Sequence, residues 1–163
     1  MRASRPTAVY LRDHEMGAQA GMRGFARAAS SQRSRPWGRD LAHLAVQVRE
    51  DLRTEQRILR RLRVRRNHLA APAAALGERL GRLKGNGAVL RRSPTTDLVE
   101  LEGLLMMVHG KRAGWRSLET AGGVPGFDMG ALVARADAQT RRLQAMHDQA
   151  AAVLRERTGR ARG

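Results

Sequence analysis

The chain has 163 residues, a length typical of one domain with a sizeable core. Its 31 Lys and Arg against 15 Asp and Glu give a formal net charge of +16, which favours contact with polyanions at low salt but confers no specificity. It contains no cysteine, which excludes disulfides, thiolate nucleophiles and cysteine-ligated zinc. No apolar run approaches the roughly 18 residues of a membrane span, and acidic residues come too early for a signal peptide. We therefore predict a cytoplasmic protein with no membrane contact.

The composition favours helices over sheets. Aromatic residues make up only 3% of the chain, and its apolar residues are mainly Ala, Leu and Val without β-branched runs. Nearly all the basic residues are Arg, a usage typical of GC-rich bacterial genomes, so codon bias alone can account for the charge. We predict a single all-α domain over residues 1–163.

The first predicted helix spans residues 7–29. Its apolar stripe includes His14, which is either a core side chain bonded to a neighbour or a ligand or proton carrier. Glycines at 17, 21 and 24 each cost about 1 kcal/mol relative to Ala inside a helix. Close approach of another helix would explain them.

The second predicted helix spans residues 40–64, with Asp40 as its cap. Asp51 and Glu55 lie one turn apart on or beside its apolar face, as interior groups or as partners of neighbouring Arg at the edge of the stripe. The arginines near its C-terminal end and in the following connection form either a solvated helix end or a polyanion site: Arg57, Arg60, Arg61, Arg63, Arg65, Arg66, Arg91 and Arg92.

A long connection follows, with a short helix predicted at about 72–84. The sequence GRLKGNG at its end has glycines and a lysine, but it lacks the spacing of a phosphate-binding loop. The connection is therefore predicted to be a crossover.

The third predicted helix spans residues 96–121 and is the longest run that reads unambiguously as one amphipathic helix. Lys111 occupies a position in its apolar stripe, so it either snorkels from the edge of the stripe or is buried with Asp51 or Glu55 as its partner. The pair Met106 and Met107 lies off this stripe and is predicted to cover the crossover or a second subunit.

The fourth predicted helix spans residues 128–157 and has Gln139 as its polar interior residue. Short loops join the first two and the last two long helices, whereas about 30 residues separate the second from the third. Two hairpins joined by one long crossover form a ferritin-like four-helix bundle. This is the predicted fold.

Three segments support this prediction by resemblance: YLRDH at 10–14, GERLGRLK at 77–84 and LVELEGLL…GKRAGW at 98–115. Over residues 8–155 the chain resembles uncharacterised ferritin-like four-helix-bundle proteins of high-GC bacteria. The resemblance implies a fold and leaves the activity open.

The ligand set of a ferritin-like di-iron centre is incomplete. Such centres need Glu-x-x-His on two helices, but Glu55 is followed at that spacing by Ile58, and His147 is preceded by Gln144. We therefore predict no metal and no cofactor.

These patterns predict a non-enzymatic helical bundle with a structural or interaction role, acting as a homodimer or with a protein partner. A buried polar cluster is predicted to stand in place of the di-iron centre: His14, Asp51, Glu55, Lys111 and Gln139. Two alternatives remain open. One is weak, sequence-independent nucleic-acid or polyanion binding, and the other is a metal-binding or oxidoreductase function based on the polar cluster.

Overall fold

The computed structural model describes residues 2–65 and 94–160. Within them lie four helices, α1 (Arg5–Ser31), α2 (Gly38–Arg61), α4 (Pro94–Thr120) and α5 (Met129–Arg160), and no strand. The all-α prediction is therefore confirmed for this part of the chain. The short helix predicted at 72–84 lies outside the described residues.

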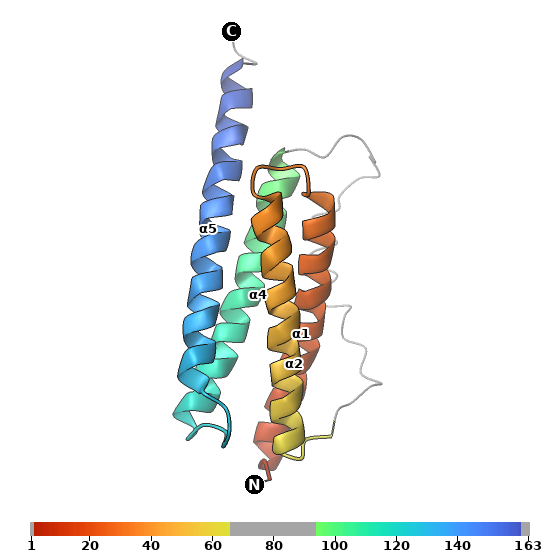
Figure 1. The fold of residues 1–163 in the computed structure, drawn as a ribbon, viewed down its shortest axis with the longest axis vertical. Helices are drawn as coiled ribbons and strands as arrows, with labels where there is room; N and C mark the ends of the chain where they lie inside the picture. The colour runs from red at the N-terminus through yellow and green to blue at the C-terminus, as the bar shows by residue number, and fades with distance from the viewer. Residues whose placement is uncertain (1, 66–93, 161–163) are drawn as a thin grey trace.

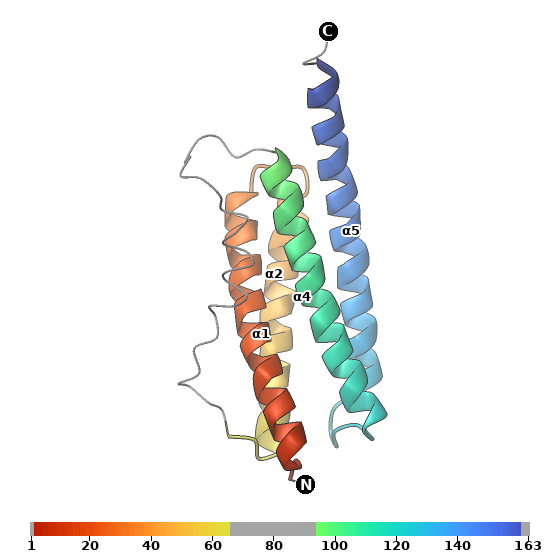
Figure 2. The ribbon, with the colours of Figure 1, turned by 180° about the vertical axis from the view of Figure 1, so that it is seen from behind.

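The four helices lie side by side, with their axes roughly aligned along the length of the molecule (Figure 1). α1 and α2 form an antiparallel hairpin, α4 and α5 form a second one, and α2 and α4 run in the same direction (Figures 1 and 2). α1 packs against both α2 and α4, while α5 packs mainly along α4. None of the helices in the described ranges carries a stretch long and apolar enough to cross a membrane.

The helix starts differ from the predicted ones by up to two residues. Ser4 caps α1, which begins two residues before the predicted start at residue 7, and the Ser4 hydroxyl accepts a hydrogen bond from the backbone N–H of Thr7 at 3.3 Å. α2 begins at Gly38, which places Asp40 in its first turn near the positive end of the helix dipole. Asp128 caps α5 as expected from its position, because its Oδ1 accepts from the N–H of Ala131 at 2.8 Å.

Glycines make both tight connections possible. A Cβ on Gly38 would lie 2.5 Å from the carbonyl oxygen of Arg33, so the turn between α1 and α2 leaves no room for a side chain there. α4 ends at Gly122 and Gly123, which have φ of 96° and 74°, and the N–H of Gly123 donates to the carbonyl of Leu118 at 2.9 Å. This is a Schellman termination, which favours glycine because other residues rarely adopt positive φ.

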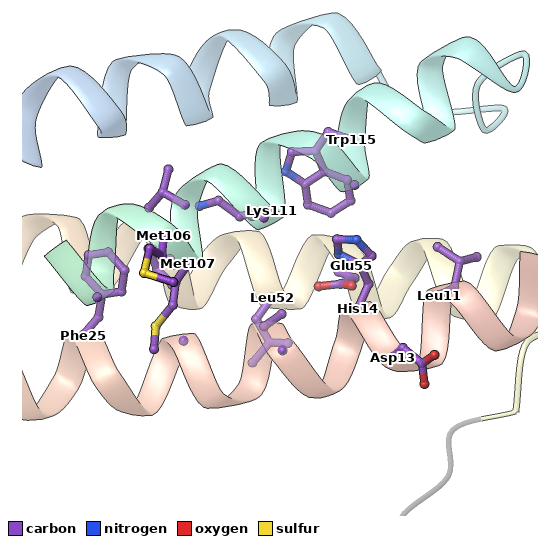
Figure 3. A pocket seen from close by; sticks show the side chains of 18 of the residues that line it. Leu11, Asp13, His14, Phe25, Leu52, Glu55, Met106, Met107, Lys111 and Trp115 are labelled. Atoms are coloured by element: carbon purple, nitrogen blue, oxygen red, sulfur yellow. The ribbon is translucent and has the colours of Figure 1, made fainter. Parts of the chain in front are cut away.

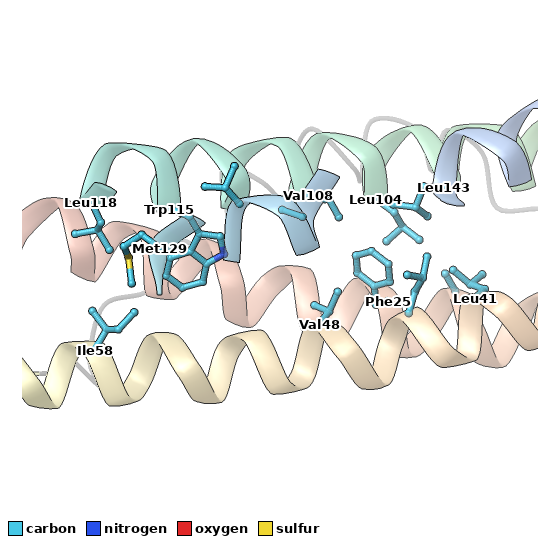
Figure 4. Packing of buried hydrophobic residues seen from close by; sticks show 14 of the residues in the cluster. Phe25, Leu41, Val48, Ile58, Leu104, Val108, Trp115, Leu118, Met129 and Leu143 are labelled. Carbon is cyan, nitrogen blue, oxygen red and sulfur yellow. The ribbon is translucent and has the colours of Figure 1, made fainter. Parts of the chain in front are cut away.

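The core is a continuous apolar layer between the two hairpins (Figure 4). Leu41, Leu44 and Ile58 of α2 are fully buried, and Leu101 and Val108 of α4 are at most 1% exposed. Each such side chain contributes about 1.5–3 kcal/mol relative to an exposed position. The inward stripes therefore account for the packing of the hairpins.

A polar network closes the end of the bundle near the α1–α2 turn. The indole N–H of Trp37 donates to Gln32 Oε1 at 2.6 Å, and Gln32 Nε2 donates to Glu100 Oε2 at 2.9 Å. Arg35 pairs with the buried Asp97 at 2.7 Å. The helix stripes gave no sign of this network, because Gln32 and Arg35 lie in the connecting segment.

Candidate functional site

Lys111, Asp51 and Gln139 meet in the interior, each from a different helix. Lys111 Nζ lies 2.5 Å from Asp51 Oδ2 and 2.5 Å from Gln139 Oε1. Gln139 Nε2 donates in turn to Asp51 Oδ2 at 2.9 Å. We name these three residues the central cluster. Its hydrogen bonds join α2, α4 and α5 at one level of the bundle. The sequence left open whether Asp51 or Glu55 is the partner of Lys111, and in the structure the partner is Asp51.

Arg135 of α5 adds a second cation beside Asp51. Its Nε lies 3.0 Å from Asp51 Oδ1, although the angle at this nitrogen does not make a hydrogen bond. Its Nη2 donates to Glu50 Oε2 at 2.6 Å and to the carbonyl oxygen of Gln47 at 3.2 Å. This arginine does not stand out in the sequence. It lies one helical turn before Gln139, at the edge of the inward stripe of α5, where an arginine gives no signal of burial.

Electrostatics in the central cluster are dominated by burial and by Asp51. Burial lowers the pKa of Lys111, while the charge of Asp51 and its hydrogen bond act in the opposite direction. The Lys111 side chain is 11% exposed and that of Asp51 is 3% exposed. The ammonium is therefore a buried group with a bonded counter-charge.

Glu55, one turn after Asp51, has a different environment. It is 4% exposed, and among the described residues it forms no hydrogen bond or ion pair. Burial raises its pKa to about 8, and the nearby charge of Glu15 raises it further than Asp51 does. At neutral pH Glu55 is therefore mainly a neutral carboxylic acid.

His14 lies at the contact between α1 and α4, apart from the central cluster. Its ring is 4.7 Å from that of Tyr10, centroid to centroid, and a Cβ on Gly114 would lie 2.6 Å from His14 Cε1. Burial lowers the pKa of His14, and the charge of Asp13 opposes this effect. His14 is thus held as a mainly neutral ring against a glycine of the facing helix.

The sequence predicts that another helix approaches α1 closely at its three glycines, and the structure shows this at two of them. A Cβ on Gly21 or Gly24 would meet the Met107 sulfur at 3.6 or 3.4 Å. Gly17 differs, because a Cβ there meets no described atom within 4 Å. Met107 therefore packs on α1. The contact of the methionine pair with the crossover or a second subunit stays a prediction.

A cavity of about 590 Å³ lies between α1 and α4, and α2 forms its floor (Figure 3). Its lining is mostly apolar and includes Leu11, Phe25, Leu52, Met107 and Trp115. Glu55 and Lys111 also line it, so the cavity reaches from the surface to the edge of the central cluster. The apolar stripes of the helices do not indicate this cavity, because the cavity depends on how far apart α1 and α4 lie.

The predicted polyanion site is only partly described. Its five members on and just after α2 are exposed: Arg57, Arg60, Arg61, Arg63 and Arg65. The other three lie outside the described residues: Arg66, Arg91 and Arg92.

Residues 2–65 and 94–160 contain no group of three or more His, Asp or Glu side chains placed to hold a metal ion. Comparison of the chain with protein-family models, curated proteins and solved structures gave no match.

Proposed function

We propose that this protein is a non-enzymatic helical bundle that binds an apolar small molecule between α1 and α4. The observation that carries the proposal is a cavity of about 590 Å³ with apolar walls and one buried carboxyl group, Glu55, that has no partner in the described residues. Ligand sites usually enclose about 300–1,000 Å³ and combine apolar walls with a few polar groups. Both features are present here.

The central cluster has a structural role in this proposal. Lys111, Asp51 and Gln139 bond to one another, which leaves the ammonium engaged on the side away from the cavity. Buried ion pairs of this kind serve to specify how helices pack more than they add to stability. The cluster would fix the level at which α2, α4 and α5 meet, in the place where ferritin-like relatives hold iron. The parallel course of α2 and α4 supports a ferritin-like topology.

The binding proposal is tested with a neutral apolar fluorescent probe, N-phenyl-1-naphthylamine, added to the full chain. We expect saturable binding with about one site per chain. Trp115 lines the cavity, so its emission, isolated in a Trp37→Phe background, should change on binding.

Two substitutions of Gly17 form a matched pair of controls. Gly17 lines the cavity and has open space around it. Gly17→Ala should retain probe binding, whereas Gly17→Phe should weaken it because the ring would enter the same apolar space. Equal binding by both variants, or no saturable binding to the unmodified chain, would contradict the proposal.

A second candidate, sequence-independent polyanion binding, is favoured by the exposed arginines at the end of α2. Five of these arginines lie in the described residues and form no ion pair there: Arg57, Arg60, Arg61, Arg63 and Arg65. An electrophoretic shift with duplex DNA at low salt should show binding that is lost as salt rises. Absence of a shift at low salt would exclude it. The predicted homodimer or protein partner remains a prediction, which light scattering checks.

A further inference from the structure

The charge of the cavity is opposite to that of the whole protein. Three carboxyl side chains are among its described lining residues: Asp13, Glu55 and Glu102. Of the 31 Lys and Arg in the chain, only Lys111 is among those lining residues. Its ammonium is already bonded to Asp51 and Gln139. The described part of the cavity lining therefore presents acidic groups without free cations, although the formal net charge of the protein is +16.

Glu55 is the deepest of these carboxyl groups. It is 4% exposed, comes from the floor helix α2 and lies between α1 and α4, beside His14 (Figure 3). Burial of a carboxyl group without a partner is unfavourable when the group is ionised. A cation that entered the cavity would supply the missing counter-charge.

The walls also suit a cation with a large apolar body. The rings of Tyr10, Phe25 and Trp115 line the cavity, and aromatic faces attract cations through their quadrupole. The thioethers of Met106 and Met107 add flexible, polarisable surface that adapts to ligands of different shape. Among the described lining residues an anion would meet Asp13, Glu55 and Glu102, the last of which also contacts His147 at 3.2 Å, and no unengaged cation.

From this arrangement we infer that the cavity between α1 and α4 binds lipophilic organic cations, with Glu55 as the counter-ion. This inference rests on the proposed binding function and names its ligand class. The long-range field of the protein repels cations, so selection for them must come from the cavity itself. A preference for cations is therefore not expected from the net charge.

The test compares two probes of the same shape and opposite charge, tetraphenylphosphonium and tetraphenylborate, on the full chain. We expect the cation to bind saturably and to compete with the neutral probe N-phenyl-1-naphthylamine. Added salt should strengthen cation binding, because it screens repulsion by the positive surface, and should weaken adventitious anion binding. Tighter displacement of the neutral probe by the anion than by the cation would overturn the inference.

Glu55→Gln is the decisive variant, because it keeps the size of the side chain and removes the charge. We expect its affinity for tetraphenylphosphonium to fall by about tenfold or more, while its affinity for the neutral probe stays within about twofold. The matched control is Glu119→Gln, which removes a carboxylate of α4 that is outside the cavity lining. It should bind both probes as the unmodified chain does.

Proton release provides an independent readout. Glu55 is mainly neutral at pH 7, so it must lose its proton to solvent when it pairs with a cation. Titration calorimetry in buffers of different ionisation enthalpy should detect this proton at pH 7 and should lose the signal in Glu55→Gln. Besides Glu55, the charged and titratable groups that line the cavity are Asp13 and His14 of α1 and Glu102 and Lys111 of α4, and the charges of Glu15 of α1 and Asp51 of α2 also act on Glu55. Arg135 of α5 acts on Lys111.

The outcomes separate this inference from the proposed function. Neutral-probe binding without cation preference, or cation binding unchanged by Glu55→Gln, would overturn the inference and leave the function in place. Failure of all probes to bind the full chain would overturn both.

Discussion

Asp51 and Glu55 are two carboxyl side chains of the same helix, one turn apart and equally buried, yet their surroundings differ. Asp51 is 3% exposed and lies among Lys111, Gln139 and Arg135. Glu55 is 4% exposed and faces the cavity beside α1 without a bonded partner in the described residues. The first is part of a closed bonding network, and the second is a group that a ligand can still reach.

The comparison shows that burial alone does not decide what a buried acid does. Burial favours the neutral form of any carboxyl group, and a bonded cation favours the ionised form. For Glu55 the first effect prevails, because the charge of Lys111 only partly offsets desolvation and the repulsion from Glu15. Asp51 holds the ammonium at 2.5 Å and so stabilises a charge that would otherwise be unfavourable in the core.

The largest expected effect comes from removing the charge of Asp51. Asp51→Asn should lower the free energy of unfolding by about 3–5 kcal/mol, because it leaves the buried Lys111 ammonium without its counter-charge. Urea denaturation followed by circular dichroism measures this change.

Lys111→Met provides the matched control for Asp51→Asn. It removes the cation and leaves Asp51 beside Gln139 and Arg135, so it should cost less than about 1 kcal/mol or stabilise the protein. The double variant should recover most of the stability lost in Asp51→Asn. A stability of Asp51→Asn close to that of the unmodified chain would contradict the role assigned to the cluster.

An intermediate effect is expected from the titration of Glu55. Its pKa is about 8 in the folded protein against 4.5 as the ordinary value, so between these values the folded state holds more protons than the unfolded state. The contribution of Glu55 to stability is therefore greatest below pH 4.5 and falls as pH rises to about 8. From pH 5 to 7 the expected loss is about 2–3 kcal/mol.

The difference between the unmodified chain and Glu55→Gln isolates this contribution. Other groups, such as His14, titrate in both proteins and cancel in the difference. Urea midpoints at several pH values should converge at low pH, with Glu55→Gln the more stable protein toward pH 8. Parallel pH profiles for the two proteins would show that Glu55 is not a buried neutral acid.

The smallest effects concern the wall of the cavity on the Glu55 side. Gly114→Ala should destabilise the protein by about 1–3 kcal/mol, because its Cβ would lie 2.6 Å from the His14 ring. Gly110→Ala, one turn earlier on α4, meets no described atom within 4 Å and should stabilise α4 by about 0.5–1 kcal/mol. Thermal unfolding of both variants checks the contrast, and adding His14→Ala should relieve the first effect.

Several features of the bundle follow from local sequence alone. The apolar stripe of α2 is buried where its spacing indicates, from Leu41 to Leu59, because a period of 3.6 residues leaves one face to bury. The glycines after Thr120 ended α4 as their freedom to adopt positive φ suggests. Helix ends were less well determined, since α1 and α2 begin at Arg5 and Gly38, each two residues before the predicted start.

The candidate site was only partly within reach of the sequence. Lys111, Asp51 and Gln139 stand out as polar residues in apolar stripes, and the structure bonds them together. His14 and Glu55 stand out in the same way, but neither joins the bonds of the central cluster. Arg135 lies at the edge of its helix, where an arginine gives no signal of burial.

The sequence by itself determined the helices and their inward faces, because these depend on periodicity and turn chemistry. Of the buried polar residues it indicated Asp51, Glu55 and Gln139, but not Glu15, Gln32 or Asp97. The tertiary structure decided which of the two carboxyl groups forms the ion pair with Lys111. Positions four residues apart differ by only about 40° around a helix, so Asp51 and Glu55 belong to one face in the sequence. In the bundle that small rotation turns Asp51 toward α4 and α5 and Glu55 toward α1 and the cavity.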